Sequence, residues 1–283
     1  MTDTRHLAPA HGLRFSPDWI TRPLFGVLLA ALVIAADFKG PQYLAIFVAL
    51  GAVFAVREWH RMVWPQSYLF EMALSAVTII GAVLALILWP RDVFPWAILG
   101  AGALVALIVA LIRGEQPAWQ AGGILYLGIP ALAMIATRAI PPNGAWLIVG
   151  LFLIVWATDT GALVAGNLIG GPKLAPVLSP NKTWAGTLGG IAAAAAVEAI
   201  YVGVLGGNPL LASLYGAGLA VVAHAGDLFE SWVKRSFHRK DSGSLIPGHG
   251  GILDRVDSTL FAVSALAVLV LVLRLDPLFG AHP

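Results

Sequence analysis

Cysteine is absent from this chain of 283 residues, which excludes disulfide bonds, thiolate nucleophiles and cysteine metal sites. Charge is also scarce: Asp, Glu, Lys and Arg make up 11% of the residues, whereas soluble proteins have about 25%. The formal net charge of +2 is too small to suggest nucleic acid as a partner. Hydrophobic residues, by contrast, make up 59% of the chain. Together these figures indicate a membrane protein that crosses the lipid bilayer several times.

Long apolar runs recur along most of the sequence. Runs of about 17–25 residues can cross a bilayer as helices, so the predicted fold is all-α, a polytopic integral membrane protein with about nine spans. The predicted spans are 23–38, 41–56, 68–89, 93–112, 119–137, 145–169, 185–205, 209–228 and 258–274. We divide the chain into an N-terminal tail (1–21), N-terminal transmembrane helices (22–140) and a C-terminal transmembrane region (141–283) with polar loops at 170–184 and 229–257.

The placement of Lys and Arg predicts an orientation. With nine spans, the N-terminal tail and every second loop share one side of the membrane. Only four of the 17 Lys and Arg residues would then lie on the other side, namely Lys39, Arg91, Arg138 and Arg274. Cytoplasmic loops carry the excess of Lys and Arg. We therefore expect a multi-pass membrane protein with its N-terminus and polar loops in the cytoplasm.

The polar run from Ser231 to Ser258 holds, with Asp227 and Glu230 just before it, about a third of all charged residues. Asp254 and Asp257 are spaced i,i+3, which places them on one face of a helix. Carboxylates of this kind suit Mg²⁺, which takes one or two of them plus substrate phosphates. Helix capping by Asp254 or Asp257 is the structural alternative. Asp227 ends its predicted span, where the helix dipole disfavours an anion, so a functional role is favoured there.

Basic residues crowd the same run and predict an anionic, multiply charged partner. Arg can bind phosphate through two parallel hydrogen bonds, and Lys acts as a point charge. Gly250 and Gly251 would let the backbone approach such a ligand closely. His249 could bind phosphate, donate a proton or hold the turn. A basic patch that attracts anionic lipid is the alternative for the charges alone. The cations concerned are Lys234, Arg235, Arg239, Lys240 and Arg255.

A second polar loop, 170–184, ends in Ser179-Pro180-Asn181-Lys182-Thr183 before an apolar run. Ser or Thr at that point can cap a helix, and a helix N-terminus attracts anions, to which Lys182 would add positive charge. Upstream, Asp159 lies inside or near the end of the sixth span, where an acid is a functional candidate, with helix packing as the alternative. Glu71 and Glu198 are also within predicted spans, but each is isolated in the sequence and receives no role.

The polar run resembles the signature of phosphatidate cytidylyltransferases of the bacterial type, also called CDP-diacylglycerol synthases. No defining position departs from it. The upstream segments at 159–162 and 179–186 are similar to that family as well, and the resemblance is specific over about 155–260. The matching positions are Ser231, Lys234, Arg235, Lys240, Asp241, Gly243, Ile246, Pro247, His249, Gly250, Gly251, Asp254, Arg255 and Asp257.

The resemblance implies transfer of CMP from CTP to phosphatidic acid, with release of pyrophosphate. Mg²⁺ is implied on Asp227 and Asp254, with Asp257 assisting, and a second cation, monovalent or divalent, is left open. The lipid bilayer is the expected surroundings and a homodimer is also left open. The expected catalytic residues are Asp227, Asp254, Lys234, Arg235, Lys240, His249 and Arg255. The expected substrate-binding residues are Ser179, Asn181, Lys182, Thr183, Ser231, Gly250, Gly251 and Asp159.

Three rival functions remain to be weighed. A transporter or channel would spread its charges through the spans, whereas here they gather in two loops. The second rival is a different enzyme that acts on lipid phosphates, such as a phosphatase or a CDP-alcohol phosphotransferase. The Asp-Gly-x-x-Ala-Arg pattern of CDP-alcohol phosphotransferases is absent from this sequence. A non-catalytic lipid-binding protein would need the basic residues but not Asp227, Asp254 and Asp257. Incorporation of label from CTP into lipid would distinguish the cytidylyltransferase activity from all three rival functions.

Overall fold

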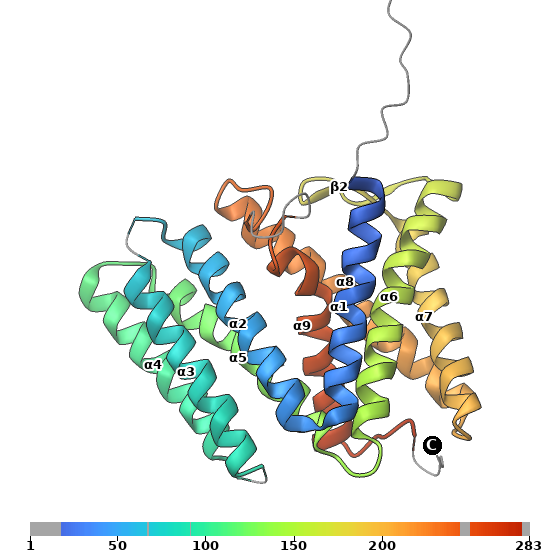
Figure 1. Ribbon diagram of the computed structural model, residues 1–283. Helices are drawn as coiled ribbons and strands as arrows, with labels where there is room; N and C mark the ends of the chain where they lie inside the picture. The colour runs from blue at the N-terminus through green and yellow to red at the C-terminus, as the bar shows by residue number, and fades with distance from the viewer. Residues whose placement is uncertain (1–17, 67, 91, 244–249, 279–283) are drawn as a thin grey trace, which may run out of the picture.

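The computed structural model describes residues 18–66, 68–90, 92–243 and 250–278, and in this part of the chain the architecture is a helical bundle (Figure 1). A two-stranded hairpin and a short π-helical turn are added to the helices. The helices are α1 (Asp18–Lys39), α2 (Pro41–Val63), α3 (Leu69–Leu88), α4 (Phe94–Arg113), α5 (Pro117–Arg138), α6 (Gly144–Ile169), α7 (Trp184–Val204), α8 (Pro209–Ser236) and α9 (Leu253–Ala267). The remaining elements are the strands β1 (Lys173–Ala175) and β2 (Ser179–Thr183) and the π-helix η1 (Val268–Val272).

Glycine and proline set several helix ends. Gly40 adopts φ 137°, a left-handed value open to glycine, and Pro41 then starts α2. Gly114 ends α4 in the left-handed conformation, and Pro117 starts α5. Asn208 caps α8, because its Oδ1 accepts the backbone N–H groups of Leu210 and Leu211 at 3.0 and 3.2 Å. The breaks therefore follow local turn chemistry.

Eight helices of the described residues are long and apolar enough to cross a membrane, which confirms a polytopic all-α membrane protein. They are α2 to α8 and the segment Leu253–Val272. They correspond to eight of the predicted spans. The structure also has a helix, α1, where the first span was predicted, but a count of nine is not confirmed.

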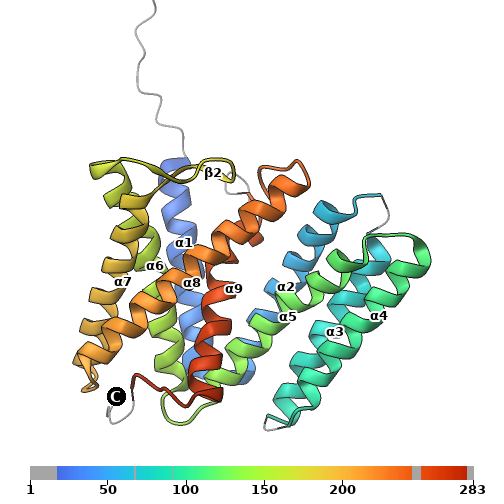
Figure 2. The ribbon, with the colours of Figure 1, turned by 180° about the vertical axis from the view of Figure 1, so that it is seen from behind.

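The helices form two groups that share α9. Figure 1 shows α2, α3, α4 and α5 on one side, α6 and α7 on the other, and α9 between them. Figure 2 shows α8 running obliquely across the back of the bundle. Leu253, at the start of α9, belongs to the hydrophobic core of the first group, whereas Val263 and Leu266 belong to the core of the second. The helix that carries Asp254 and Asp257 is thus fixed by both cores.

The polar segments gather at one end of the bundle. The hairpin, the segment between α8 and α9, and the α2–α3 connection all lie at the upper end in Figure 1. The opposite end holds the turn at Gly40, the α5–α6 connection and an ion pair of 2.8 Å between Arg138 and Asp37 that ties α5 to α1. The two ends of the bundle thus hold the connections that the sequence assigned to opposite sides of the membrane.

One local prediction was wrong. The eighth span does not end at residue 228, because α8 continues to Ser236, so Asp227 lies well inside the helix and the dipole argument for it fails. The polar loop 170–184 contains a short hairpin, in which β1 and β2 pair antiparallel with Lys173 opposite Thr183. Glu71, which is isolated in the sequence, has a partner in the structure, since its Oε1 lies 2.6 Å from Nη1 of Arg113. Only tertiary packing brings Glu71 and Arg113 together, across 42 positions of sequence.

Candidate active site

A polar cavity of about 590 Å³ opens at the end of the bundle where the loops gather. Five carboxylates line it, together with Lys234 and Arg255, so acidic and basic side chains lie in one cavity. The lining consists of Asp159 from α6, Asp227 and Lys234 from α8, Asp254, Arg255, Asp257 and Ser258 from α9, and Asp241 and Gly250 from the segment between α8 and α9.

A close crossing of α8 and α9 joins two of the carboxylates. A Cβ atom built on Gly226 would lie 2.7 Å from the backbone oxygen of Asp257 and 2.9 Å from Cβ of Phe261. Both distances are too short for any other side chain without movement of a helix. Glycine at 226 therefore allows α8 to lie against α9, and this contact sets the position of Asp227 relative to Asp257.

Lys182, on the hairpin, contacts a residue that lines the cavity. It forms an ion pair with Asp227, across 45 positions of sequence. The next residue, Thr183, starts α7: its Oγ1 accepts the backbone N–H of Gly186 at 3.1 Å, as predicted for a cap. The hairpin and the cap together hold Lys182 beside the carboxylates.

Asp254 organises the segment before α9. Its Oδ1 lies 2.6 Å from Nζ of Lys234. Its Oδ2 accepts the Ser242 backbone N–H at 3.0 Å, the Ser242 hydroxyl at 2.9 Å and the Gly251 backbone N–H at 2.9 Å. The residue at the N-cap position of α9 is Ile252, without a side-chain cap. Asp254 is therefore a centre of hydrogen bonds between α8, α9 and the segment between them, which goes beyond helix capping.

Glu58 was missed by the sequence analysis. It lies on α2, is 2% exposed, and its Oε2 accepts the Leu253 backbone N–H at 3.0 Å and the Ser242 hydroxyl at 3.3 Å. A buried acid on an apolar helix is costly unless it has partners, and this rule would have marked Glu58 as a candidate. Its partner Ser242 is 184 positions away, so the pairing itself has no sequence signal.

The other predicted site residues take different places. Asp159 is exposed and lines the cavity, so it is not a buried packing residue. Gly251 donates its backbone N–H to Asp254, as described above. His249 lies outside the described residues. The described residues of the predicted site that do not line the cavity are Ser179, Asn181, Lys182, Thr183, Ser231, Arg235, Lys240 and Gly251.

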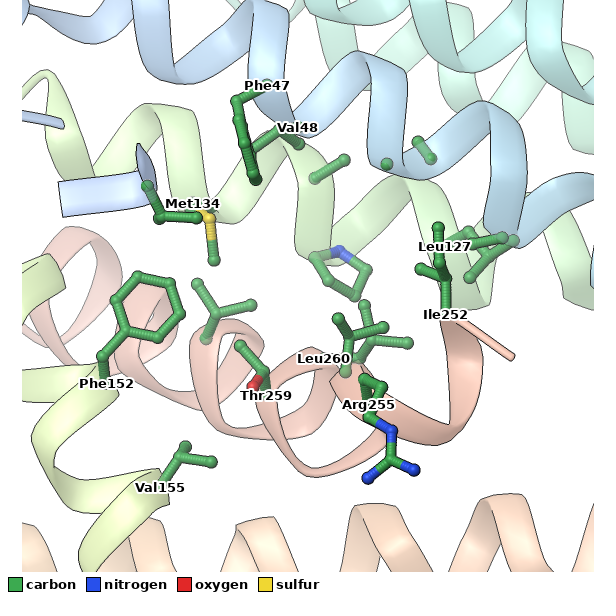
Figure 3. Close-up of a pocket in the computed structure, with 18 of the residues that line it drawn as sticks. Phe47, Val48, Leu127, Met134, Phe152, Val155, Ile252, Arg255, Thr259 and Leu260 are labelled. Atoms are coloured by element: carbon green, nitrogen blue, oxygen red, sulfur yellow. The ribbon is translucent and has the colours of Figure 1, made fainter. Parts of the chain in front are cut away.

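An apolar cavity of about 640 Å³ adjoins the polar one. It lies between α1, α2, α5, α6 and α9, and Asp159 and Arg255 line both cavities. Figure 3 shows Phe47, Met134 and Phe152 around this space, with the guanidinium of Arg255 pointing away from them. The polar end of the apolar cavity is thus also part of the charged site.

The carboxylates of the polar cavity fit Mg²⁺. Their oxygens are hard ligands, and the cavity leaves room for phosphate oxygens to complete the coordination. In the described part of the chain, no group of three or more acidic or histidine side chains forms a ready metal centre. Asp254 is engaged by Lys234, Ser242 and Gly251, and Asp227 is engaged by Lys182.

Fold and cavities define an integral membrane protein with a charged site at one end of its helices. The chain matches the Cytidylyltransferase family over residues 20–273, and it belongs to that family. The phosphatidate cytidylyltransferase of Brucella suis biovar 1 (strain 1330) is 37% identical over 252 residues, which cover 87% of this chain and 91% of that protein. The phosphatidate cytidylyltransferase of Staphylococcus aureus (strain COL) is 32% identical over 265 residues, 88% and 98% of the two chains.

Proposed function

We propose that the protein transfers CMP from CTP to phosphatidic acid and forms CDP-diacylglycerol and pyrophosphate for phospholipid biosynthesis. One observation carries the proposal: a charged cavity and an apolar cavity meet at Asp159 and Arg255. A phosphatidate molecule needs both, since its acyl chains are apolar and its phosphate is anionic. The names of the related proteins support the same reaction.

The reaction is a displacement at phosphorus. A phosphate oxygen of phosphatidate forms a bond to the α-phosphorus of CTP, while the bond from that phosphorus to the bridging α,β-oxygen breaks and pyrophosphate leaves. A phosphate monoester has its second pKa at about 6, so the nucleophile is already ionised near neutral pH and needs no strong general base. The protein must mainly hold two polyanions together.

Lys234, Arg255 and Lys182 are placed to do this. The side chains of Lys234 and Arg255 line the cavity, and Lys182 on the hairpin forms an ion pair with Asp227, which also lines it. Mg²⁺ would be held by Asp227 and Asp257, with Asp254 next to them, and when bound it supplies positive charge to neutralise the phosphates. Arg255, shared by both cavities, is assigned to the phosphate of the lipid.

The proposed site lies on the cytoplasmic side of the inner membrane. Lys173, Lys182, Lys234 and Arg239 lie on the polar segments at the end of the bundle that holds the site. Cytoplasmic loops carry such an excess of Lys and Arg. CTP is a soluble cytoplasmic nucleotide, so this orientation gives the site access to it.

The assay uses purified full-length protein in detergent with phosphatidate, Mg²⁺ and CTP labelled at the α-phosphate. We expect label in the lipid fraction and one pyrophosphate released for each labelled lipid. Label that stays water-soluble, or inorganic phosphate released from phosphatidate without CTP, would contradict the proposal.

Filling the apolar cavity is expected to weaken lipid binding selectively. Gly51 on α2 lines this cavity, and a Cβ built on it would meet no atom within 4 Å. Gly51→Leu should therefore place a side chain in the space for acyl chains and raise KM for phosphatidate about tenfold, as groups of this size do in apolar pockets. Steady-state kinetics with each substrate varied in turn measures this.

Gly100→Leu is the matched control, because Gly100 on α4 also has open space around it and lines none of the three cavities described. KM for CTP should stay unchanged in both variants. An unchanged KM for phosphatidate in Gly51→Leu would remove the apolar cavity from the lipid site.

A further inference from the structure

A second polar cavity, of about 570 Å³, lies between the C-terminal end of α2 and the segment that follows α8. Three arginines line it: Arg57 and Arg61 from α2, and Arg239 from the segment after α8. We call it the arginine cavity. Its other lining residues are Glu58, Met62, Pro65, Tyr68, Asp241, Ser242 and Gly243.

The three guanidinium groups have no acidic partner within 4 Å among the residues that the structure describes. Arg57 and Arg61 are spaced i,i+4 on one helix face, where like charges destabilise a helix. Folding adds Arg239 to the same cavity, and a hydrogen bond of 3.0 Å from Arg235 to its backbone oxygen holds that segment. Such a concentration of positive charge is favourable when an anion lies between the groups.

The two acidic residues of the cavity do not cancel this charge. Three arginines face Glu58 and Asp241, which leaves the lining net positive. Glu58 is buried, and its Oε2 is directed to Ser242 and to the backbone of Leu253. Glu58 therefore serves the fold of the segment before α9 and is not within ion-pair distance of the arginines.

The arginine cavity lies next to the carboxylate site. Asp241 lines both. Ser242 forms the wall between them, since its hydroxyl contacts Glu58 on one side and Asp254 on the other, at 3.3 and 2.9 Å. A ligand that is bound in the carboxylate site and extended by further phosphates has this basic cavity beside it.

We propose that the arginine cavity binds the β- and γ-phosphates of the nucleotide and holds the pyrophosphate after transfer. The inference rests on the proposed function, since it assigns a part of the same substrate. Guanidinium groups bind phosphate through paired hydrogen bonds, and three of them suit a ligand with two adjoining phosphates. The lining is polar and separate from the apolar cavity, which favours a soluble polyphosphate over the headgroup of a lipid.

Binding of inorganic pyrophosphate tests the site without catalysis. Isothermal titration of the full-length protein in detergent with Mg²⁺, but without CTP or lipid, should show binding to the wild type. Arg57→Gln, Arg61→Gln and Arg239→Gln should each raise the Kd about tenfold, the effect of losing one charge-assisted hydrogen-bonding group. The triple variant should bind at least a hundredfold more weakly.

Arg274→Gln is the control, since Arg274 is an exposed arginine outside these cavities and beyond α9. It should bind pyrophosphate as the wild type does. A thermal unfolding curve for each variant checks that the fold is kept. Wild-type affinity in the folded triple variant, or no binding of pyrophosphate to the wild type, would overturn the proposal.

Kinetics distinguishes the two sources of phosphate. In the three variants we expect KM for CTP to rise about tenfold and KM for phosphatidate to stay unchanged, because uniform binding of the nucleotide is lost. A rise in KM for phosphatidate alone would assign the cavity to a lipid headgroup and overturn the proposal. If the wild type transfers CMP and the variants keep both KM values, only this inference fails. If pyrophosphate binding depends on the arginines but no CMP is transferred, the proposed function fails.

Discussion

Replacing Asp227 with asparagine is expected to lower kcat for CDP-diacylglycerol formation by about 10³-fold, the size seen when a group that stabilises charge in a transition state is removed. The substitution keeps the shape of the side chain but removes its negative charge. The proposed Mg²⁺ then loses a ligand, and Lys182 loses the partner that holds it beside the cavity. Initial rates of labelled lipid formation at saturating CTP and phosphatidate measure the effect.

Asp92→Asn is the matched control for this variant. Asp92 is exposed in the connection between α3 and α4, away from the polar cavity, and the same charge is removed there. Its kcat should equal that of the wild type. Turnover of Asp227→Asn within tenfold of the wild type, at any Mg²⁺ concentration, would contradict the assignment of Asp227.

Gly226→Ala is expected to have the second large effect, although it adds only one methyl group. The new Cβ would overlap the backbone oxygen of Asp257, so α8 and α9 must move apart by several tenths of an ångström or more. Overpacking of this kind costs about 1–3 kcal/mol of stability. Because Asp227 and Asp257 lie on the two separated helices, kcat should fall on the order of 10²-fold, as misplacement by about 1 Å does in positioned reactions.

Gly218→Ala provides the comparison on the same helix. Gly218 on α8 is exposed, and a Cβ there would meet no atom within 4 Å. Alanine is also the better helix former, so stability should be kept or slightly raised. Thermal unfolding in detergent and the lipid assay report stability and kcat separately. Equal behaviour of the two variants would show that the crossing does not set the geometry of the site.

Much of the fold follows from the sequence because the spans are strongly apolar and their ends carry glycine and proline. The spacing of Asp254 and Asp257 also predicts a shared helix face, and α9 bears this out. The end of α8 was misplaced because hydropathy falls after residue 228 while the helix continues, stabilised by packing of Val233 in the core. Hydropathy reports contact with lipid, and a helix that rises out of the membrane has no such signal.

The charged residues of the site could be predicted from the sequence, but the residues that position them could not. Asp227, Lys234, Asp254 and Arg255 stand out in an apolar chain wherever they lie. Glu58 and Gly226 act through contacts with segments distant in sequence, and nothing near them in the chain marks those contacts. The arginine cavity could not be predicted from the sequence either. In the sequence, Arg57 and Arg61 resemble the ordinary polar end of a membrane helix, and only the fold brings Arg239 into the same cavity.

The sharing of α9 between the two hydrophobic cores limits how substrates can be exchanged. A transporter that works by alternating access rocks one half of its fold against the other. Here such rocking would have to pull Leu253 from one core or Val263 from the other. A catalyst gains from this immobility, because α9 carries Asp254 and Asp257. We therefore expect lipid to enter laterally from the bilayer and nucleotide to enter from the aqueous end of the bundle. The helix α9 stays fixed between the two cores during this exchange.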